Sequence, residues 1–262
     1  PRFPRLFVTD LDGTALGGGF QPYARFPDAF SAFLDRLAER GCAWAINTTW
    51  DAGGQWQLVV ASAVRSRPAF FMAEVGHRLA LWGEGGPEFV QPYTERMEAE
   101  VSRACEKRLF GLMREIHGRF RPKRANFYGH WFDFAPLEAD RPQFAEYVRS
   151  LPATDGDLHI EAPADGQRVV AFPSVLAKRK ALQEAMRLLE IGPADVVAAG
   201  DAAMDLSMMG PDAAQHAVAP ANATPEVQAH VRAMDGEVAS EPFGAGVIHA
   251  FATLACRRGW RF

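Results

Sequence analysis

Residues 6–14 read LFVTDLDGT, a short apolar run that is followed at once by two closely spaced aspartates. A second apolar run, residues 196–201, reads VVAAGD and also ends in an aspartate. Short continuous apolar runs bounded by Gly and Asp are typical of buried strands in a parallel sheet. Because ligands bind beyond the carboxyl ends of such strands, we expect Asp10 and Asp201 to share one crevice.

Helix and strand patterns alternate on both sides of these two runs. Apolar spacing predicts strands over residues 42–46, 69–73 and 216–219, and helices over 30–38, 56–63, 182–189, 225–233 and 247–255. This order predicts an α/β fold, a Rossmann-like doubly wound parallel sheet with helices on both faces.

The pattern changes between residues 87 and 172. Glycines and a proline over 83–87 form a break. The following segment predicts a long helix over 94–117, a strand over 126–134, a helix over 141–151, and strands over 158–162 and 168–172. This α+β order predicts an inserted second domain at 87–172, with a core made of residues 1–86 and 173–262.

Charge and composition argue against several classes of protein. The formal net charge is −4, so no overall positive field is present to hold nucleic acid. Cys42, Cys105 and Cys256 are scattered without a CxxC pair, which argues against a disulfide framework or a zinc site and favours reduced thiols in the cytoplasm. No run approaches the roughly 18 consecutive apolar residues that span a bilayer, so we expect no membrane segment.

Several acidic residues follow the predicted strands, and they are candidates for a metal site. They are Asp10, Asp12, Asp201 and Asp205. Carboxylates placed together repel one another unless a cation lies among them, and oxygen ligands without His or Cys favour Mg²⁺. Either Asp motif alone could be a simple turn, because Asp and Gly are turn residues. The presence of both, with Thr48 and Lys178 between them, favours the metal site.

These residues carry a resemblance to a known family. The sequence DLDGT at 10–14 resembles the first signature of the haloacid dehalogenase-like phosphohydrolase superfamily. Thr48 resembles its second motif, Lys178 its third, and GDAAMD at 200–205 its fourth. The order and spacing match over nearly the whole chain. The insertion between the second and third motifs is similar to the large α/β cap of the Cof-like, sucrose-phosphate and trehalose-phosphate phosphatases, which implies that residues 87–172 form a substrate-specificity cap.

The resemblance and the chemistry of these groups together imply a Mg²⁺-dependent phosphatase. Its expected substrate is a small phosphorylated metabolite, with a sugar phosphate favoured. Asp10 would be the nucleophile and would form an aspartyl-phosphate. Asp12 would donate a proton to the leaving oxygen and then take one from the attacking water.

The remaining motif residues would hold the metal and the phosphoryl group. Magnesium would bind the Asp10 carboxylate, the Asp12 backbone carbonyl and Asp201, with Asp205 as a further ligand or orienting one through water. Thr48 could donate a hydrogen bond to a phosphoryl oxygen. Lys178 would offset the charge that develops during transfer, with Lys180 as the alternative.

Three residues depart from the pattern of this subgroup. Trp50 stands where the second motif usually has Arg, Met204 replaces the usual Asn of the fourth motif, and Val75 stands where Asn usually follows the third strand. None removes a proposed catalytic group. They motivate a second hypothesis, a catalytically weak protein that binds a phosphorylated metabolite in the same pocket.

The predicted cap contains a basic and aromatic segment. Its members are Arg119, Arg121, Lys123, Arg124, Phe127, Tyr128, His130 and Trp131. These side chains could cover a phosphorylated sugar, but we favour a structural interpretation, a solvated loop followed by a strand with one buried face. The sequence indicates no oligomeric state.

Overall fold

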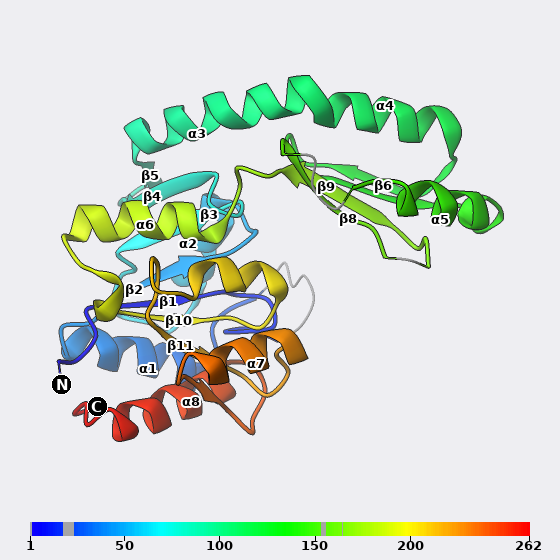
Figure 1. Ribbon diagram of the computed structural model, residues 1–262. Helices are drawn as coiled ribbons and strands as arrows, with labels where there is room; N and C mark the ends of the chain where they lie inside the picture. Colours follow the sequence, from blue (N-terminus) through cyan, green and yellow to red (C-terminus); the bar gives the residue numbers. More distant parts are fainter. Residues whose placement is uncertain (1, 18–23, 153–155, 164) are drawn as a thin grey trace. The chain divides into compact units, whose positions relative to one another are not determined.

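The computed structural model describes residues 2–17, 24–152, 156–163 and 165–262 (Figure 1). The chain divides into two compact units. The core unit is Pro1–Thr94 with Ala177–Phe262, and the inserted unit is Glu95–Leu176. Both boundaries fall later than the predicted 87 and 172. The first one shifts because residues 87–89 form a strand that pairs within the core sheet.

The core unit is built on one sheet. Its strands are β1 (Leu6–Thr9), β2 (Ala43–Asn47), β3 (Phe70–Ala73), β4 (Arg78–Trp82), β5 (Pro87–Phe89), β10 (Val196–Ala199), β11 (His216–Ala219) and β12 (Glu237–Val238). Their order is β12-β11-β10-β1-β2-β3-β4-β5, parallel from β12 to β3. The predicted Rossmann-like sheet is therefore confirmed. The antiparallel edge strands β4 and β5 were not predicted; they arise because a tight turn after β3 reverses the chain.

Helices cover both faces of the core sheet. They are α1 (Asp28–Glu39), α2 (Ala52–Ala61), α6 (Lys178–Leu189), α7 (Pro225–Ala233) and α8 (Phe243–Arg257), with short 3₁₀ segments at Pro193–Asp195 and Ala203–Met208. α1, α2 and α8 share one buried cluster, in which the rings of Phe33 and Phe251 lie edge-on to Phe7 at 5.3 and 5.7 Å. α6 covers the opposite face (Figure 1). Strands β1 and β10 are buried throughout, which explains their continuous apolar sequences.

The register of the central strands brings the predicted motifs to one edge. Thr9 is paired with Ala199 of β10 on one side and with Ile46 of β2 on the other. Because the three strands are parallel and end at the same level, the residues that follow them lie at the same edge of the sheet.

The inserted unit has its own antiparallel sheet. Its elements are α3 (Gln91–Ala104, which begins in the core unit), a π-helical segment (Cys105–Leu109), α4 (Phe110–Arg119), β6 (Pro122–Phe127), β7 (Phe132–Pro136), a 3₁₀ turn (Glu138–Asp140), α5 (Arg141–Arg149), β8 (Leu158–Glu161) and β9 (Val169–Pro173). The strand order is β6-β7-β9-β8. Phe134 and Phe144 are fully buried, with ring centroids 5.5 Å apart, and anchor α5 to the sheet.

One predicted helix of the inserted segment is composite, and one predicted strand is in fact two. The long helix predicted over 94–117 is a run of α3, the π segment and α4 without a break in the chain direction (Figure 1). The single strand predicted over 126–134 is wrong, because the chain turns there between β6 and β7. Gly129 has a φ of +78°, and the Tyr128 amide donates to the Trp131 carbonyl, so the two strands form a hairpin.

Candidate active site

Aspartates from distant parts of the chain lie at the carboxyl edge of the core sheet. Asp10 directly follows β1, and its amide donates to the Ala199 carbonyl at 3.0 Å, which continues the β1–β10 pairing by one residue. Asp201 lies two residues after β10. Thr48 follows β2 and is buried, with its amide donating to Met72 of β3. The sheet therefore places three predicted site residues on neighbouring strand ends.

A buried lysine joins two of the carboxylates. Lys178 begins α6, and its Nζ lies 2.7 Å from Asp10 Oδ1 and 2.5 Å from Asp205 Oδ1. The relative exposures are only 2% for Lys178, 6% for Asp10 and 0% for Asp205. Asn47, at the end of β2, donates from Nδ2 to the Lys178 carbonyl at 2.9 Å and fixes the start of the helix. Lys180, the alternative candidate, is exposed.

Asp205 has hydrogen-bond partners at both of its carboxylate oxygens. Oδ1 accepts from Lys178, while Oδ2 accepts the backbone amides of Asp201 and Ala202 at 2.8 and 2.9 Å. A Cβ atom at Gly200 would lie 2.4 Å from Asp205 Cβ, so only glycine allows this close approach. Asp205 therefore shapes the Asp201 loop and orients Lys178.

Asp201 is held against the first motif. Thr14 donates from Oγ1 to Asp201 Oδ1 at 2.7 Å. A Cβ atom at Gly13, where φ is +81°, would lie 2.3 Å from Asp201 Oδ2. Asn222 donates from Nδ2 to the Gly13 carbonyl at 2.7 Å. The contacts of Thr14, Asn222 and Asn47 could not be anticipated from the sequence, although Thr14 lies in the DLDGT motif.

Asp12 has an aromatic partner. The indole Nε1 of Trp50 donates to Asp12 Oδ2 at 2.6 Å. Trp50 is the residue that replaces the usual Arg of the second motif. The departure from the family pattern therefore contacts the residue predicted to move the proton.

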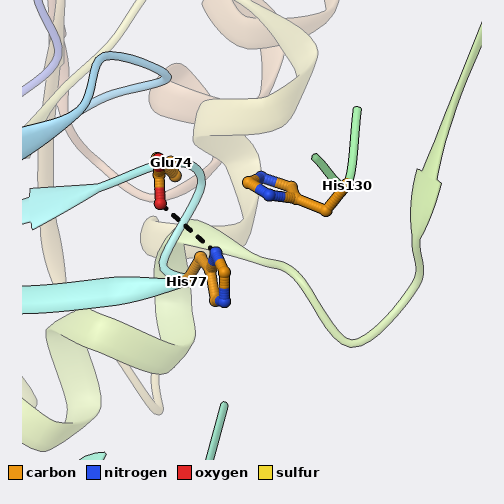
Figure 2. A group of neighbouring side chains, drawn as sticks. All are labelled: Glu74, His77 and His130. Carbon is orange, nitrogen blue, oxygen red and sulfur yellow. Dashed lines mark ion pairs between the residues drawn. The ribbon is translucent and has the colours of Figure 1, made fainter. Parts of the chain in front are cut away.

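The turn between β3 and β4 supports this second motif. Glu74, Val75 and Gly76 have φ values of +53°, +59° and +82°, a left-handed run that is unfavourable for Val. The Glu74 amide donates to the Trp50 carbonyl, and the Val75 amide donates to the Thr48 carbonyl, each at 3.1 Å. Figure 2 shows the ion pair that Glu74 makes with His77, 3.2 Å from Glu74 Oε2 to His77 Nδ1. The strained turn thus fixes the backbone on both sides of Thr49 through these two hydrogen bonds.

The electrostatics of the cluster favour a bound cation. Burial raises the pKa of Asp10 to about 7; Lys178 opposes this rise and Asp205 adds to it. Burial likewise raises the pKa of Asp201 to about 6, against the hydrogen bond from Thr14. Burial alone would lower the pKa of Lys178, but the Asp10 and Asp205 carboxylates raise it overall, so the lysine is protonated. One buried cation therefore does not compensate all the carboxylates.

The donor set of this cluster fits a hard divalent ion. Asp10, Asp201 and Asp205 each offer a carboxylate oxygen, and these atoms lie within 4.8 Å of one another. Oxygen-only donors suit Mg²⁺, which commonly keeps several waters and takes one or two carboxylates. Asp10 and Asp201 are the ligands that the geometry favours, because both oxygens of Asp205 already accept hydrogen bonds.

Most charges of the basic and aromatic segment in the inserted unit have local partners. Arg121 pairs with Asp140 at 2.8 Å, and Arg124 pairs with Asp133 at 3.0 Å. Trp131 stacks on Phe172, with centroids 4.4 Å apart and planes 4° from parallel. These contacts favour the structural interpretation of the segment.

The inserted unit also contains an open pocket of about 400 Å³. Its charged lining residues are Arg96, Glu100, Arg103 and Asp157. The two signs of charge are mixed, so this pocket offers no uniform positive field for a phosphate. The functional assignment therefore rests on the aspartate cluster of the core unit.

No helix in the described ranges combines the length and the apolar character that crossing a membrane requires.

Comparisons with known proteins agree with this geometry. Residues 134–243 match the family model of the haloacid dehalogenase-like hydrolases. The matched segment contains Lys178, Asp201 and Asp205, and it lies after Asp10 and Asp12. A comparison with curated proteins gave no match.

Solved structures share the fold over nearly the whole chain. The sucrose-phosphatase of Synechocystis sp. PCC6803, in complex with sucrose and phosphate, has a TM-score of 0.66 at 16% identity, with 97% of this chain and 98% of that chain covered. A phosphatase-superfamily protein of Bacteroides thetaiotaomicron has a TM-score of 0.60 at 14% identity, covering 97% and 96%. A haloacid dehalogenase-like hydrolase of Bacillus subtilis has 0.58 at 13%, covering 99% and 94%. The chain therefore shares its fold with these proteins over nearly its whole length, and part of it, residues 134–243, matches the model of the haloacid dehalogenase-like hydrolases.

Proposed function

We propose that this chain is a magnesium-dependent phosphatase that acts on a small phosphorylated metabolite through an aspartyl-phosphate on Asp10. The observation that carries the proposal is the contact of Lys178 with Asp10, 2.7 Å apart and buried, beside Asp201 at the carboxyl edge of the sheet. A carboxylate nucleophile needs neighbouring positive charge to approach a phosphate dianion, and this arrangement supplies it.

The proposed reaction has two transfers at phosphorus. In the first, an Asp10 oxygen bonds to phosphorus as the bond to the leaving oxygen breaks, and Asp12 gives its proton to that leaving oxygen. In the second, water attacks phosphorus, Asp12 takes the water proton, and the bond to Asp10 breaks to release inorganic phosphate. Lys178 stays protonated, so it can offset charge on the phosphoryl oxygens in both transfers.

The metal and the remaining residues have supporting roles. Asp10, Asp201 and the Asp12 backbone carbonyl would hold Mg²⁺, which when bound supplies positive charge beside the phosphoryl group. Asp205 would orient Lys178 and the Asp201 loop. Thr48 would bind a phosphoryl oxygen, and the inserted unit would act as the specificity cap.

A sugar phosphate is the favoured substrate class. The likeness to a sucrose-phosphatase supports this choice, although at 16% identity the likeness concerns the fold. Cys42, Cys105 and Cys256 are free thiols, which suits a reducing compartment such as the cytoplasm.

Phosphate release from a panel of sugar phosphates, nucleotides and phosphoglycerates tests the proposal. We expect release that needs added Mg²⁺, stops with a chelator, and falls by at least about 100-fold in Asp10→Asn. Asp212→Asn, an exposed aspartate paired with Arg179, is the matched control and should retain activity.

Two outcomes would contradict the proposal. Equal turnover in wild type and Asp10→Asn would exclude the nucleophile. Binding of a sugar phosphate without any turnover in the wild type would instead support the binding-protein hypothesis.

A further inference from the structure

Trp50 contacts only one of the two oxygens of the Asp12 carboxyl group. Asp12 Oδ2 accepts the indole N–H at 2.6 Å. Within the described part of the chain, Asp12 Oδ1 has no hydrogen-bond partner, although it is buried. The two oxygens of one carboxyl group therefore have different environments.

Trp50 itself is firmly anchored through its backbone. Its carbonyl accepts two hydrogen bonds, from the Glu74 amide at 3.1 Å and from Gln55 Nε2 at 3.0 Å. Gln55 is fully buried. The next residue, Asp51, caps α2 by accepting the Gly54 amide at 2.8 Å. A rigid ring on a fixed backbone is well suited to orient a neighbouring side chain.

The chemistry of the indole assigns the two oxygens different tasks. An indole N–H can donate a hydrogen bond but cannot accept one. Oδ2 therefore faces Trp50 as an acceptor, whether Asp12 is ionised or protonated. Because the carbonyl oxygen of a carboxylic acid accepts a hydrogen bond better than its hydroxyl oxygen does, this contact favours Oδ1 as the oxygen that carries the proton.

We propose that Trp50 is a positioning residue, which fixes Asp12 Oδ2 so that Oδ1 exchanges the proton with the leaving oxygen and with water. The inference rests on the proposed phosphatase function. In the first transfer the Oδ1–H bond breaks and an O–H bond forms on the leaving oxygen, while Oδ2 remains an acceptor for Trp50. In the second transfer Oδ1 regains a proton from the attacking water.

The test uses the basicity of the leaving group. Trp50→Phe keeps an aromatic ring and removes the N–H. An alkyl phosphate needs its leaving oxygen protonated, whereas p-nitrophenyl phosphate releases a stable anion and needs little help. We expect Trp50→Phe to lower kcat/KM about tenfold or more for glycerol phosphate or a sugar phosphate that the wild type hydrolyses, and less than about threefold for p-nitrophenyl phosphate.

Trp56→Phe is the matched control. Its indole N–H donates to the Gly83 carbonyl at 3.2 Å and its ring stacks on Trp82, so the same substitution removes a similar hydrogen bond elsewhere in the core unit. It should change both substrates by less than about twofold. In an Asp12→Asn background, Trp50→Phe should have no further selective effect, because the group that it positions is gone.

The outcomes separate this inference from the proposed function. If wild type and Asp10→Asn do not differ, the phosphatase proposal fails. If they differ but Trp50→Phe slows both substrates equally, or neither, only the role of Trp50 is overturned. Should Trp50→Phe not fold, Trp50→His replaces it. We then expect a selective loss of kcat/KM for the alkyl phosphate that is smaller than the loss expected for Trp50→Phe. An unchanged ratio of kcat/KM for the alkyl phosphate to that for p-nitrophenyl phosphate overturns the inference.

Discussion

Replacing Asp10 by Asn should stabilise the folded protein when divalent cations are absent. Burial raises the pKa of Asp10 from 3.8 to about 7, so folding favours the protonated carboxyl over the carboxylate. This group therefore supports the folded state below about pH 4, and that contribution is lost as the pH rises to about 7. At about 1.4 kcal/mol per pH unit, the loss amounts to roughly 4 kcal/mol at pH 8. Asn resembles the neutral form and avoids this loss.

The pH dependence distinguishes this explanation from a general packing effect. The free energy of unfolding of Asp10→Asn should exceed that of wild type by up to about 4 kcal/mol at pH 8, but by only about 2 kcal/mol at pH 5. Urea unfolding in a chelator-containing buffer measures the difference. Asp212→Asn, with its side chain 56% exposed, should change stability by less than about 0.5 kcal/mol at both pH values.

The result that would refute the reasoning is a stability difference that does not shrink between pH 8 and pH 5. A destabilised Asp10→Asn at pH 8 would also refute it, because the attraction to Lys178 would then outweigh the cost of burying the carboxylate. Added Mg²⁺ should stabilise the wild type more than Asp10→Asn, since it would relieve that cost.

Three further predictions concern other parts of the two units. Lys178→Met should abolish turnover and lower the free energy of unfolding by about 3 kcal/mol at pH 8, because the buried carboxylates of Asp10 and Asp205 lose their cation. Urea titration measures this free energy, and a change below about 1 kcal/mol would contradict the prediction. Gly13→Ala should reduce Mg²⁺-dependent phosphate release at least about tenfold, since the new Cβ would lie 2.3 Å from the Asp201 carboxylate. Wild-type activity of this variant would contradict the prediction, because it would show that the Asp201 loop can move away. Phe144→Ala should cost about 3–5 kcal/mol by removing a fully buried ring from the inserted unit, and thermal unfolding measures it; a change within 1 kcal/mol would refute the packing description.

Much of the core fold was accessible from sequence because its signals are local. Residues 6–9 and 196–199 are buried on both faces and therefore read as apolar runs that end in Asp. The five-residue strand β4 and the three-residue strand β5 were not predicted, because such short strands with exposed positions have no distinctive periodicity. The hairpin at Gly129 was missed for a related reason, since aromatic residues continue through the turn and hide it.

The candidate site was predicted only at the level of residue types. The aspartates and Lys178 follow from motif spacing, but their contacts depend on the register of β1, β2 and β10. Trp50 and Asp12 are 38 positions apart, and only the paired strands bring the indole to the carboxylate. From the sequence alone Trp50 is therefore only a departure from the motif pattern, and its hydrogen bond to Asp12 depends on the folded structure.

The left-handed turn after β3 constrains which sequences this protein can tolerate. A Cβ atom at Gly76 would lie 2.4 Å from the carbonyl oxygen of Ala177, the residue just before Lys178. Any side chain introduced there must displace either the turn or the start of α6. Substitutions at residues 74–76 would therefore displace the Lys178 ammonium group, which lies about 100 positions later in the chain. We expect libraries that vary this turn to contain few active members, even though none of its side chains needs to touch a substrate.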